Sequence, residues 1–495
     1  MTFLGLDIGS SELKIVVFDG VGRSLDTVQT SVPHLDIPGR AEMNADAVWQ
    51  TVVRAIRKLN PGIRREIGAA AISSHGESFV PIDDHGTTTA NFILNIDLRA
   101  AHEIAEFVES FGRQRLYEAT GLAPHPKYTL PKVAWLRRHE PEIFARSTKF
   151  LCMEDYLLSR LQLEPTISRS LASRTMGFGL RESAWNTELL NFAGISEQKL
   201  SRAASSGTPV GTMSTRVAGE LGLSPKVVWC VGGHDQACAS IGSGSLDRNA
   251  VTDGTGTFEC ASIHLEQPLV SSASFAANLS CEGHVIPNRY LTLAAVPGGM
   301  VLKWVRDNFA HSGESSYDAL LAGLPIEPTG IFSFPYLVGT GTPWLDSRAK
   351  GAVYGLNSST TRQSLTQAML EGVSYEMRWN FEALRGAGVA VGEVLAVGGG
   401  ARSDAWLQLK SDIFGCAVVR VPGEASARGA AICAAMAVGE YQSWGEAVSA
   451  MVTRGQVFEP RTEVQLRYDE LFQEYKELAH RIYGYRLPAE QDQSS

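Results

Sequence analysis

The segment 232–236, Gly-Gly-His-Asp-Gln, places a carboxylate and a carboxamide side by side at the end of an apolar run. The preceding residues, 227–231, are typical of a buried strand, and the small residues 237–241 favour a tightly packed helix. Paired glycines at such a junction let another molecule approach the backbone. Asp235 could therefore present a general base to a ligand, although an Asp in this place is also a common helix N-cap.

The N-terminal residues 4–19 form an apolar run, a turn of small polar residues and a second apolar run. This pattern predicts a β-hairpin with Asp7 at its mouth. Backbone amides and hydroxyl groups at Gly9, Ser10 and Ser11 could hold phosphate oxygens, and Asp7 could bind Mg²⁺ through water. An ordinary hairpin turn explains the same residues equally well.

A near copy of this pattern occurs at residues 251–260, where Asp253 precedes Gly254, Thr255 and Gly256 between strand-like residues. Two turns of this kind on one chain are harder to explain as ordinary turns. They predict two related half-structures that face each other across a phosphate site.

A cluster of three glycines, 398–400, follows a short apolar run. Ser403 is the predicted N-cap of a helix that ends at Gly415 and carries apolar residues at helical spacing on one face. Glycines at this junction leave room for a flat ring or a phosphate near the helix N-terminus. A tight strand-to-helix turn is the alternative explanation.

Together these four segments resemble the FGGY carbohydrate kinases, the sugar and polyol branch of the actin-like and hexokinase-like ATPase superfamily. The resemblance covers nearly the whole chain, and it includes the segments 39–43 with Trp49, 95–100 and 297–307. It rests on the order and spacing of the motifs rather than on any one of them. It implies an α/β fold with two ribonuclease H-like (actin-like ATPase) domains, mixed sheets flanked by helices, and a deep interdomain cleft.

A chain of 495 residues is too long for a single core and suits two domains. The small residues 242–245 predict the boundary, which gives a sugar-binding domain with the catalytic Asp at 1–246 and an ATP-binding domain at 247–495. The second domain should end in a helix at about 463–483, with four residues packing on the body: Leu471, Tyr475, Leu478 and Ile482. The polar tail 489–495 is predicted to be disordered.

Charge and composition exclude several classes of function. The net charge is −9 with acidic and basic residues interspersed, so we expect no nucleic-acid partner. No apolar run reaches ~18 residues and no basic leader precedes the first strand, which predicts a cytoplasmic protein without a membrane span or signal peptide. The seven cysteines are scattered, which favours small core residues over disulfides or zinc.

The substrate end of the site is predicted on the turn 73–78, between strand-like residues on either side. His75 and Glu77 on this turn could bind neighbouring hydroxyl groups of a sugar. Here the resemblance divides, because xylulose-type kinases carry Met-His-Gly and this chain keeps the His-Gly pair. Glycerol-type kinases carry an Arg-Glu pair, of which only Glu77 is present. The identity of the sugar therefore stays open.

Phosphoryl transfer needs a positioned phosphate, charge neutralisation and a base for the attacking hydroxyl, and Asp235 is the predicted base. The predicted substrate-binding residues are His75, Glu77, Asp97 and Gln236. The predicted ATP-binding residues are Ser10, Ser11, Gly254, Thr255, Gly256, Gly299, Lys303, Gly399, Gly400 and Asp404, of which those from Gly299 onward are implied by the resemblance. The expected cofactors are ATP and Mg²⁺, with Asp7 and Asp253 as carboxylates near the metal.

The sequence thus predicts an ATP-dependent sugar kinase that phosphorylates a primary hydroxyl of a ketose, with a pentulose such as xylulose favoured, or of a related polyol. A hexulose, a tetritol or glycerol is an alternative substrate. Two other classes are a non-catalytic, sugar-responsive ATP-binding protein of the same fold and an actin-like or chaperone-type ATPase. The expected partners are the small-molecule sugar and ATP, and a homodimer is one option for the assembly.

Overall fold

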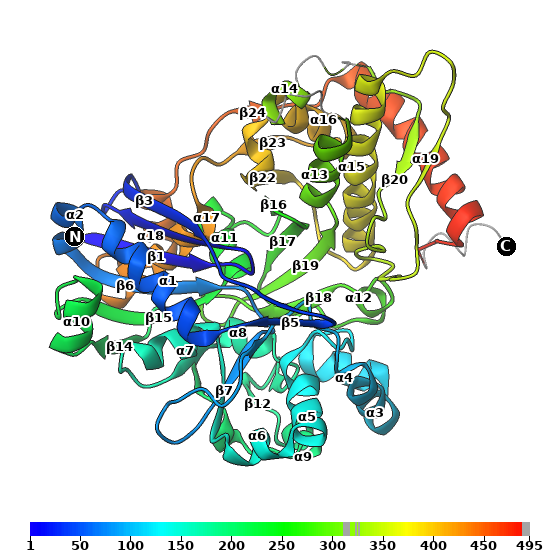
Figure 1. Ribbon diagram of the computed structural model, residues 1–495. Coiled ribbons are helices and arrows are strands. Elements are labelled where there is room, and N and C mark those ends of the chain that lie inside the picture. The colour runs from blue at the N-terminus through cyan, green and yellow to red at the C-terminus, as the bar shows by residue number, and fades with distance from the viewer. Residues whose placement is uncertain (310–316, 322–323, 325–326, 488–495) are drawn as a thin grey trace.

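Two mixed β-sheets form the frame of the molecule (Figure 1), a computed structural model that describes residues 1–309, 317–321, 324 and 327–487. The first sheet has the order β14-β15-β6-β1-β2-β3, and its central strands β15, β6 and β1 run parallel. The bounds are β1 Thr2–Ile8, β2 Glu12–Phe18, β3 Ser24–Ser31, β6 Ile67–Ser74, β14 Pro209–Thr212 and β15 Val228–His234.

The second sheet has the order β18-β19-β17-β16-β22-β23-β24. Its strands β16, β22 and β23 are parallel, whereas β16, β17 and β19 follow one another as antiparallel neighbours. The bounds are β16 Ala250–Thr255, β17 Glu259–Leu265, β18 Ser280–Gly283, β19 Tyr290–Val296, β22 Glu393–Gly398, β23 Val418–Arg420 and β24 Val457–Phe458.

The two sheets repeat one pairing pattern. In the first, the hairpin β1–β2 continues antiparallel into β3, while β1 pairs in parallel with β6 and β6 with β15. In the second, the hairpin β16–β17 continues into β19, while β16 pairs in parallel with β22 and β22 with β23. The predicted pair of related half-structures is therefore present, with Asp7 and Asp253 on equivalent strands.

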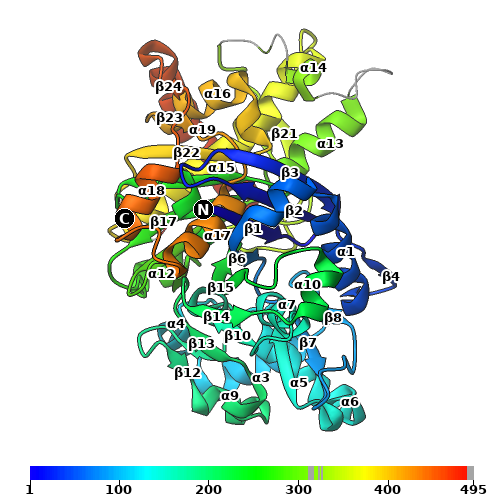
Figure 2. The same ribbon diagram turned by 90° about the vertical axis from the view of Figure 1, so that its left-hand side faces the viewer.

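A third sheet, β4-β5-β8-β7-β9, lies within the first half of the chain together with a group of helices (Figure 2). Its bounds are β4 Leu35–Ile37, β5 Arg40–Met43, β7 Phe79–Ile82, β8 Phe92–Ile93 and β9 Lys149–Cys152. The helices and short elements of this half are α1 Ala45–Lys58, α2 Pro61–Glu66, α3 Ala101–Phe111, α4 Arg113–Thr120, α5 Thr129–His139, α6 Pro141–Arg146, α7 Met153–Arg160, β10 Thr166–Ser168, α8 Arg169–Ser173, β11 Phe178–Gly179, β12 Ala184–Trp185, α9 Thr187–Ala193, β13 Arg202–Ala204, α10 Thr215–Leu221 and α11 Asp235–Ser243.

The second half of the chain contributes further helices, some of which pack on the second sheet and its core. They include α12 Ser272–Ala276, α13 Gly299–Phe309, α14 Tyr317–Leu321, α15 Arg362–Gly386, α16 Asp404–Phe414, α17 Ala425–Ala437, α18 Trp444–Met451 and α19 Thr462–Tyr483, with a small hairpin of β20 Phe332–Phe334 and β21 Ala352–Tyr354. As predicted, the side chain of Ser403 caps α16 by accepting a hydrogen bond from the amide of Trp406, and Gly415 ends the helix in a left-handed conformation.

The C-terminal helix α19 agrees with the sequence except at one residue. Tyr475 is fully buried, and Leu471 and Leu478 are half-buried, as expected. Ile482 is 47% exposed, so its predicted packing is wrong. It lies in the last turn of α19, where its neighbour Tyr483 packs against the core instead. The predicted disorder of 489–495 falls outside the described residues.

Helices α11 and α17 cross at the centre of the molecule, between the two sheets (Figure 1). A Cβ atom added at Gly242 of α11 would overlap the carbonyl oxygen of Ala425, and one added at Gly429 of α17 would overlap that of Cys238. Although α17 follows the second sheet in sequence, it packs on β1, β6 and β15 of the first. One apolar core therefore extends across the expected domain boundary.

We predict that Gly429→Ala lowers the free energy of unfolding by about 1–3 kcal/mol, because the added methyl group meets backbone that cannot move aside. Gly386→Ala is the matched control, since Gly386 also lies in a helix and a Cβ atom there meets nothing within 4 Å. The control should gain up to about 1 kcal/mol from helix propensity. Denaturant unfolding measures the free energy of unfolding of both variants. Equal values for Gly429→Ala and Gly386→Ala would contradict the close crossing of the two helices.

Candidate active site

The carboxyl ends of three parallel strands bring Asp7, His75 and Asp235 to one edge of the first sheet. In the register of the sheet, Asp7 lies opposite Ser73, and Ile8 and His234 both lie opposite Ser74. The residues that follow β6 and β15 therefore emerge beside Asp7. The sequence placed these side chains at strand ends, and the parallel pairing brings the strand ends together.

Asp235 is the first residue of α11, directly after β15. Its side chain is 22% exposed, and its Oδ1 lies 3.2 Å from Nε2 of His234. The N-cap position belongs to His234, so the alternative that Asp235 serves as the N-cap does not apply. A carboxylate at the start of a helix lies at the positive end of the helix dipole, and its oxygens are placed to accept a proton.

The turn after β6 holds His75 and Glu77 in a tightly determined conformation. Both ring nitrogens of His75 have protein partners, Nδ1 at 3.1 Å from the carbonyl of Ile8 and Nε2 at 2.9 Å from Oγ of Ser78. Burial lowers the pKa of His75, so the ring is neutral. Glu77 has a φ of 65°, a strained backbone conformation for a non-glycine residue.

The carboxylate of Glu77 is ion-paired with two cations that the sequence did not single out. Arg174 donates to Oε1 through Nε at 3.0 Å, and Nζ of Lys127 lies 3.8 Å from the same oxygen. Burial alone would raise the pKa of Glu77, but Arg174 and Lys127 outweigh it and lower the pKa to about 2. The turn therefore carries a permanent negative charge balanced by two nearby cations.

Asp97 is fully engaged with its own neighbours. Its Oδ1 accepts from Nε of Arg99 at 2.8 Å, and its Oδ2 accepts from NH2 of Arg99 at 2.6 Å and from the amide of Ala41 at 2.8 Å. These bonds fix the segment 95–100 against β5. A contact between Asp97 and a sugar stays a prediction.

Three of the segments predicted to bind ATP converge on the turn between β16 and β17. Thr255 lies opposite Gly398 in the parallel pair of β16 and β22, so Gly399 and Gly400 emerge beside it. A Cβ atom at Gly299, the first residue of α13, would overlap the carbonyl oxygen of Gly256. Gly256 and Gly399 are exposed, so backbone at this edge is open to a phosphate or a ring.

Gln236 connects the edge that carries Asp235 to this turn. A Cβ atom at Gly254 would lie 3.8 Å from Oε1 of Gln236, so the carboxamide reaches the strand β16. The predicted base and the predicted phosphate turn are therefore neighbours, although 18 positions and a domain boundary separate Asp235 from Asp253 in sequence. This closeness is what a transfer between two ligands requires.

A buried ammonium group supports the phosphate turn from behind. Nζ of Lys410, on α16, lies 2.6 Å from Oδ2 of Asp253, 3.0 Å from Oε2 of Glu259 and 3.1 Å from Oγ1 of Thr255. Burial alone would lower the pKa of Lys410, but Asp253 and Glu259 raise it. Burial and the charge of Asp253 raise the pKa of Glu259 to about 8.

The two carboxylates predicted to lie near a metal have different surroundings. Asp253 is buried and its Oδ2 is paired with Lys410, whereas its Oδ1 has no hydrogen-bond partner among the described residues, so a contact of Asp253 with a metal stays a prediction. Asp7 accepts from Oγ of Ser73 at 2.7 Å, and burial and the charge of Asp235 raise its pKa to about 7. A divalent cation would neutralise this concentration of negative charge. Within the described residues no group of three His, Cys, Asp or Glu side chains could hold a metal ion.

The remaining predicted ATP-binding residues lie at the edges of this region. Lys303 is exposed on α13 and paired with Asp307 at 2.6 Å. Asp404 is exposed at the start of α16 and paired with Arg420. Ser10 and Ser11 form the β1–β2 turn, where Nε2 of His34 lies 2.6 Å from the carbonyl oxygen of Ser10. Their contacts with ATP stay predictions.

The family follows from comparison with known proteins. The family model described as "FGGY family of carbohydrate kinases, N-terminal domain" matches residues 2–242, and the corresponding C-terminal domain matches residues 250–438. This chain belongs to the FGGY family of carbohydrate kinases. It is accordingly a phosphotransferase.

Similar proteins act on different substrates. The kinase is 28% identical over 484 residues to the xylulose kinase of Bacillus subtilis, with 96% of each chain covered. It is 28% identical over 470 residues to the gluconokinase of the same species, which covers 91% of this chain and 90% of that one. The crystal structure of gluconate kinase from Lactobacillus acidophilus superposes with a TM-score of 0.88 at 22% identity, covering 97% of this chain and 98% of that one.

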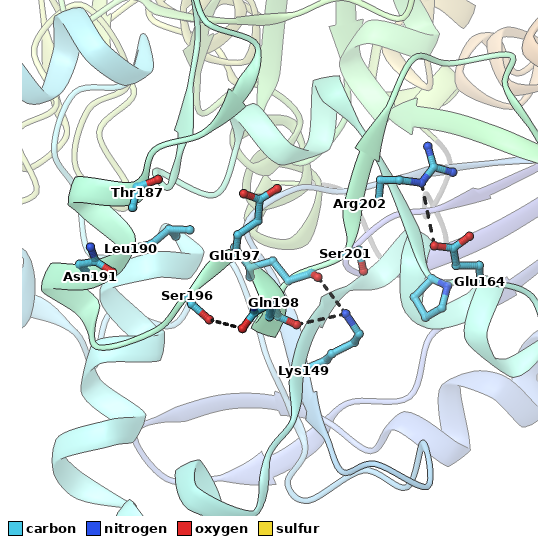
Figure 3. Close-up of a pocket in the computed structure, with 12 residues that line it drawn as sticks. Lys149, Glu164, Thr187, Leu190, Asn191, Ser196, Glu197, Gln198, Ser201 and Arg202 are labelled. Atoms are coloured by element: carbon cyan, nitrogen blue, oxygen red, sulfur yellow. Dashed lines mark hydrogen bonds and ion pairs between the residues drawn. The ribbon is translucent and has the colours of Figure 1, made fainter.

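Two pockets of the kinase lie outside this region. Figure 3 shows one of about 600 Å³ in the first half, where Lys149 reaches the carbonyl oxygens of Gln198 and Leu200 and Arg202 pairs with Glu164. The other, of about 400 Å³, is lined by Arg40 and Arg99 among others. No residue predicted for catalysis, substrate, ATP or metal lines either pocket. In the part of the chain that the structure describes, no helix is long and apolar enough to cross a membrane.

We predict that Lys410→Met lowers the free energy of unfolding of the kinase by about 3–5 kcal/mol, because it leaves Asp253 and Glu259 buried without a counter-charge. Lys303→Met is the matched control, since the ion pair of Lys303 with Asp307 is exposed and should contribute at most about 1 kcal/mol. Denaturant titration at neutral pH compares the two. Similar losses in both variants would contradict a supporting role for the buried lysine.

Proposed function

We propose that this carbohydrate kinase transfers the γ-phosphoryl group of ATP to a primary hydroxyl group of a ketose, with a pentulose such as xylulose ahead of other sugars. The observation that carries the proposal is the position of Asp235. It is a partly exposed carboxylate at a helix N-terminus, between the turn of His75 and Glu77 and the turn of Thr255. A general base in this place lies within reach of both a sugar and a phosphate.

The roles of the residues follow from the chemistry of the transfer. Asp235 accepts the proton of the attacking hydroxyl while the new oxygen–phosphorus bond forms and ADP leaves. Gln236 and the turn of His75 and Glu77 orient the sugar, because carboxamide, imidazole and carboxylate groups match a row of hydroxyls. The hydroxyl group of Thr255 and the amide of Gly256 hold phosphate oxygens.

Mg²⁺ would bind next to Asp7 and neutralise charge on the phosphates of ATP. The support for this position is the unbalanced negative charge of Asp7 and Asp235 at the edge of the first sheet. Octahedral Mg²⁺ keeps several of its waters, so a single carboxylate with phosphate oxygens suffices. Asp7 would hold the hydrated ion, which would supply positive charge to the phosphates.

We expect Asp235→Asn to lower kcat for sugar phosphorylation by ~10²–10⁴-fold, because it removes the base and preserves the shape of the side chain. Binding of ATP should stay close to that of the unmodified kinase, since the phosphate turn is intact. A coupled assay for ADP gives kcat, and calorimetric titration with a non-hydrolysable ATP analogue gives the affinity. Turnover above about a tenth of the original rate would exclude Asp235 as the base.

The preference for a pentulose rests on two lines of support. The His-Gly pair at His75 and Gly76 is the pair found in xylulose-type kinases, and a curated relative that spans the whole chain is a xylulose kinase. A gluconokinase of similar identity keeps a sugar acid as the second candidate, because Arg174 and Lys127 beside Glu77 could receive a carboxylate. Sites that read hydroxyl groups discriminate strongly, because a missing partner leaves a buried polar group unpaired.

We predict that one pentulose stands well above the other compounds in a panel of pentuloses, hexuloses, tetritols, glycerol and gluconate. His75→Ala and Glu77→Ala should each raise KM for that sugar, because each removes a hydrogen-bonding group from the substrate turn. Asp84→Ala is the control, since Asp84 is exposed beyond strand β7. Turnover of glycerol alone, or sugar kinetics unchanged in both turn variants, would show that the substrate site lies elsewhere.

A further inference from the structure

A chain of three ionisable side chains leads from the second half of the kinase to Asp235. Oε1 of Glu282, on strand β18, lies 2.6 Å from Nδ1 of His234. Nε2 of the same ring lies 3.2 Å from Oδ1 of Asp235. The imidazole ring of His234 is thus held between the two carboxylates, one from each half of the molecule.

The burial and charge of this chain determine its protonation. The side chain of Glu282 is 0% exposed and that of His234 6%, whereas Asp235 is 22% exposed at the end of the chain. Burial alone would lower the pKa of His234, but the carboxylates of Glu282 and Asp235 raise it above its ordinary value. The raised pKa favours the ring that is protonated on both nitrogens, which is hydrogen-bonded to Glu282 through Nδ1 and ion-paired with Asp235 through Nε2.

Further contacts hold the ring of His234 in one position. Its backbone amide donates to Oγ of Ser170 at 3.0 Å. A Cβ atom at Gly76 would lie 3.3 Å from Cδ2 of the ring, so the substrate turn packs directly against it. Arg174 joins the chain to that turn, because its NH1 lies 3.2 Å from Oε2 of Glu282 while its Nε donates to Glu77. The rotamer of His234 is therefore set from several sides.

We propose that His234 and Glu282 are positioning residues that fix Oδ1 of Asp235 and so present its Oδ2 to the acceptor hydroxyl. This inference rests on the proposed function, in which Asp235 is the base. Among the described residues, Oδ2 of Asp235 has no hydrogen-bond or ion-pair partner. The proton of the sugar hydroxyl passes to Oδ2 as the oxygen–phosphorus bond forms and the bond to ADP breaks, and it then leaves to solvent.

The first test compares kcat with KM in three variants. His234→Ala should lower kcat by up to roughly 10²-fold, because a carboxylate misplaced by about 1 Å costs that much. His234→Gln, whose Nε2 can donate in the place of the ring nitrogen, should recover much of that loss. Glu282→Gln should lower kcat less than His234→Ala, and KM for ATP should stay nearly unchanged in all three.

Glu376→Gln is the matched control for removing a buried carboxylate. Glu376 lies in α15, is fully buried and accepts from the hydroxyl groups of Tyr336 and Tyr475 at 2.8 and 2.7 Å. It lies outside the active site, so its kcat should match that of the unmodified kinase even where its stability falls. Nucleotide binding and circular dichroism show whether each variant is folded. If His234→Ala or Glu282→Gln does not fold, the kcat of His234→Gln decides the test.

A double-mutant cycle separates positioning from a general structural effect. In the Asp235→Asn background, His234→Ala should cause no further loss of the residual kcat, because the residue that it orients no longer acts as a base. A kcat within about twofold of the original in His234→Ala, or the same further loss in both backgrounds, would overturn the inference. A fully active Asp235→Asn variant would instead refute the proposed function, so the two failures are distinguishable.

Discussion

The close crossing of α11 and α17 is the constraint on which the rest of the structure depends. Each helix presents a glycine to a carbonyl oxygen of the other, and no side chain could be accommodated at either contact. Because Asp235 is the first residue of α11, the crossing fixes the base relative to both sheets. The alanine-rich sequence of α17 has the same origin, since only small side chains allow the helix to lie against β1, β6 and α11 together.

Buried charges then set the two ends of the reaction site. Lys410 holds the phosphate turn through Asp253, and Arg174 holds the substrate turn through Glu77. Each cation is enclosed with more than one carboxylate, so each network is satisfied only when every member is in place. Such networks contribute little net stability compared with an apolar core, but they determine geometry. Both are placed where geometry matters for phosphoryl transfer.

The sequence predicted the strands, turns and helix ends that depend on local pattern. The hairpins at Asp7 and Asp253, the strand that ends at His234 and the capping of α16 by Ser403 all follow from apolar runs, glycines and short polar residues. It did not reveal Lys410, Arg174 or Glu282, because an ion pair between distant segments leaves no periodic signal. The one available hint was the presence of charged residues inside otherwise apolar elements, as at Lys410 within α16.

The same reasoning explains why Ile482 was misplaced and why the sequence did not reveal the ion pair of Asp253 with Lys410. Helical spacing identifies a face only approximately, and in the last turn of α19 the residue that packs on the core is Tyr483, whereas Ile482 is exposed. A strand-end Asp next to glycines has the same sequence signature whether it faces a cation or an ammonium group. The partner of Asp253 is contributed by a helix about 150 residues later in the chain, so only the folded structure distinguishes the two.

The arrangement of the site divides the work between the halves of the chain. In the proposed function, the first half supplies the base and the substrate turn, and the second supplies the phosphate turn together with Glu282. Because Glu282 reaches Asp235 through His234, a displacement of the second sheet relative to the first would disturb the ion pair between His234 and Asp235. The orientation of Asp235 thus depends on the position of the second half, which carries the phosphate turn, relative to the first. Hydrolysis of ATP by water is the competing reaction for any kinase of this kind. A base that has its productive orientation only when the two halves are correctly placed relative to one another would favour transfer to the sugar over that hydrolysis.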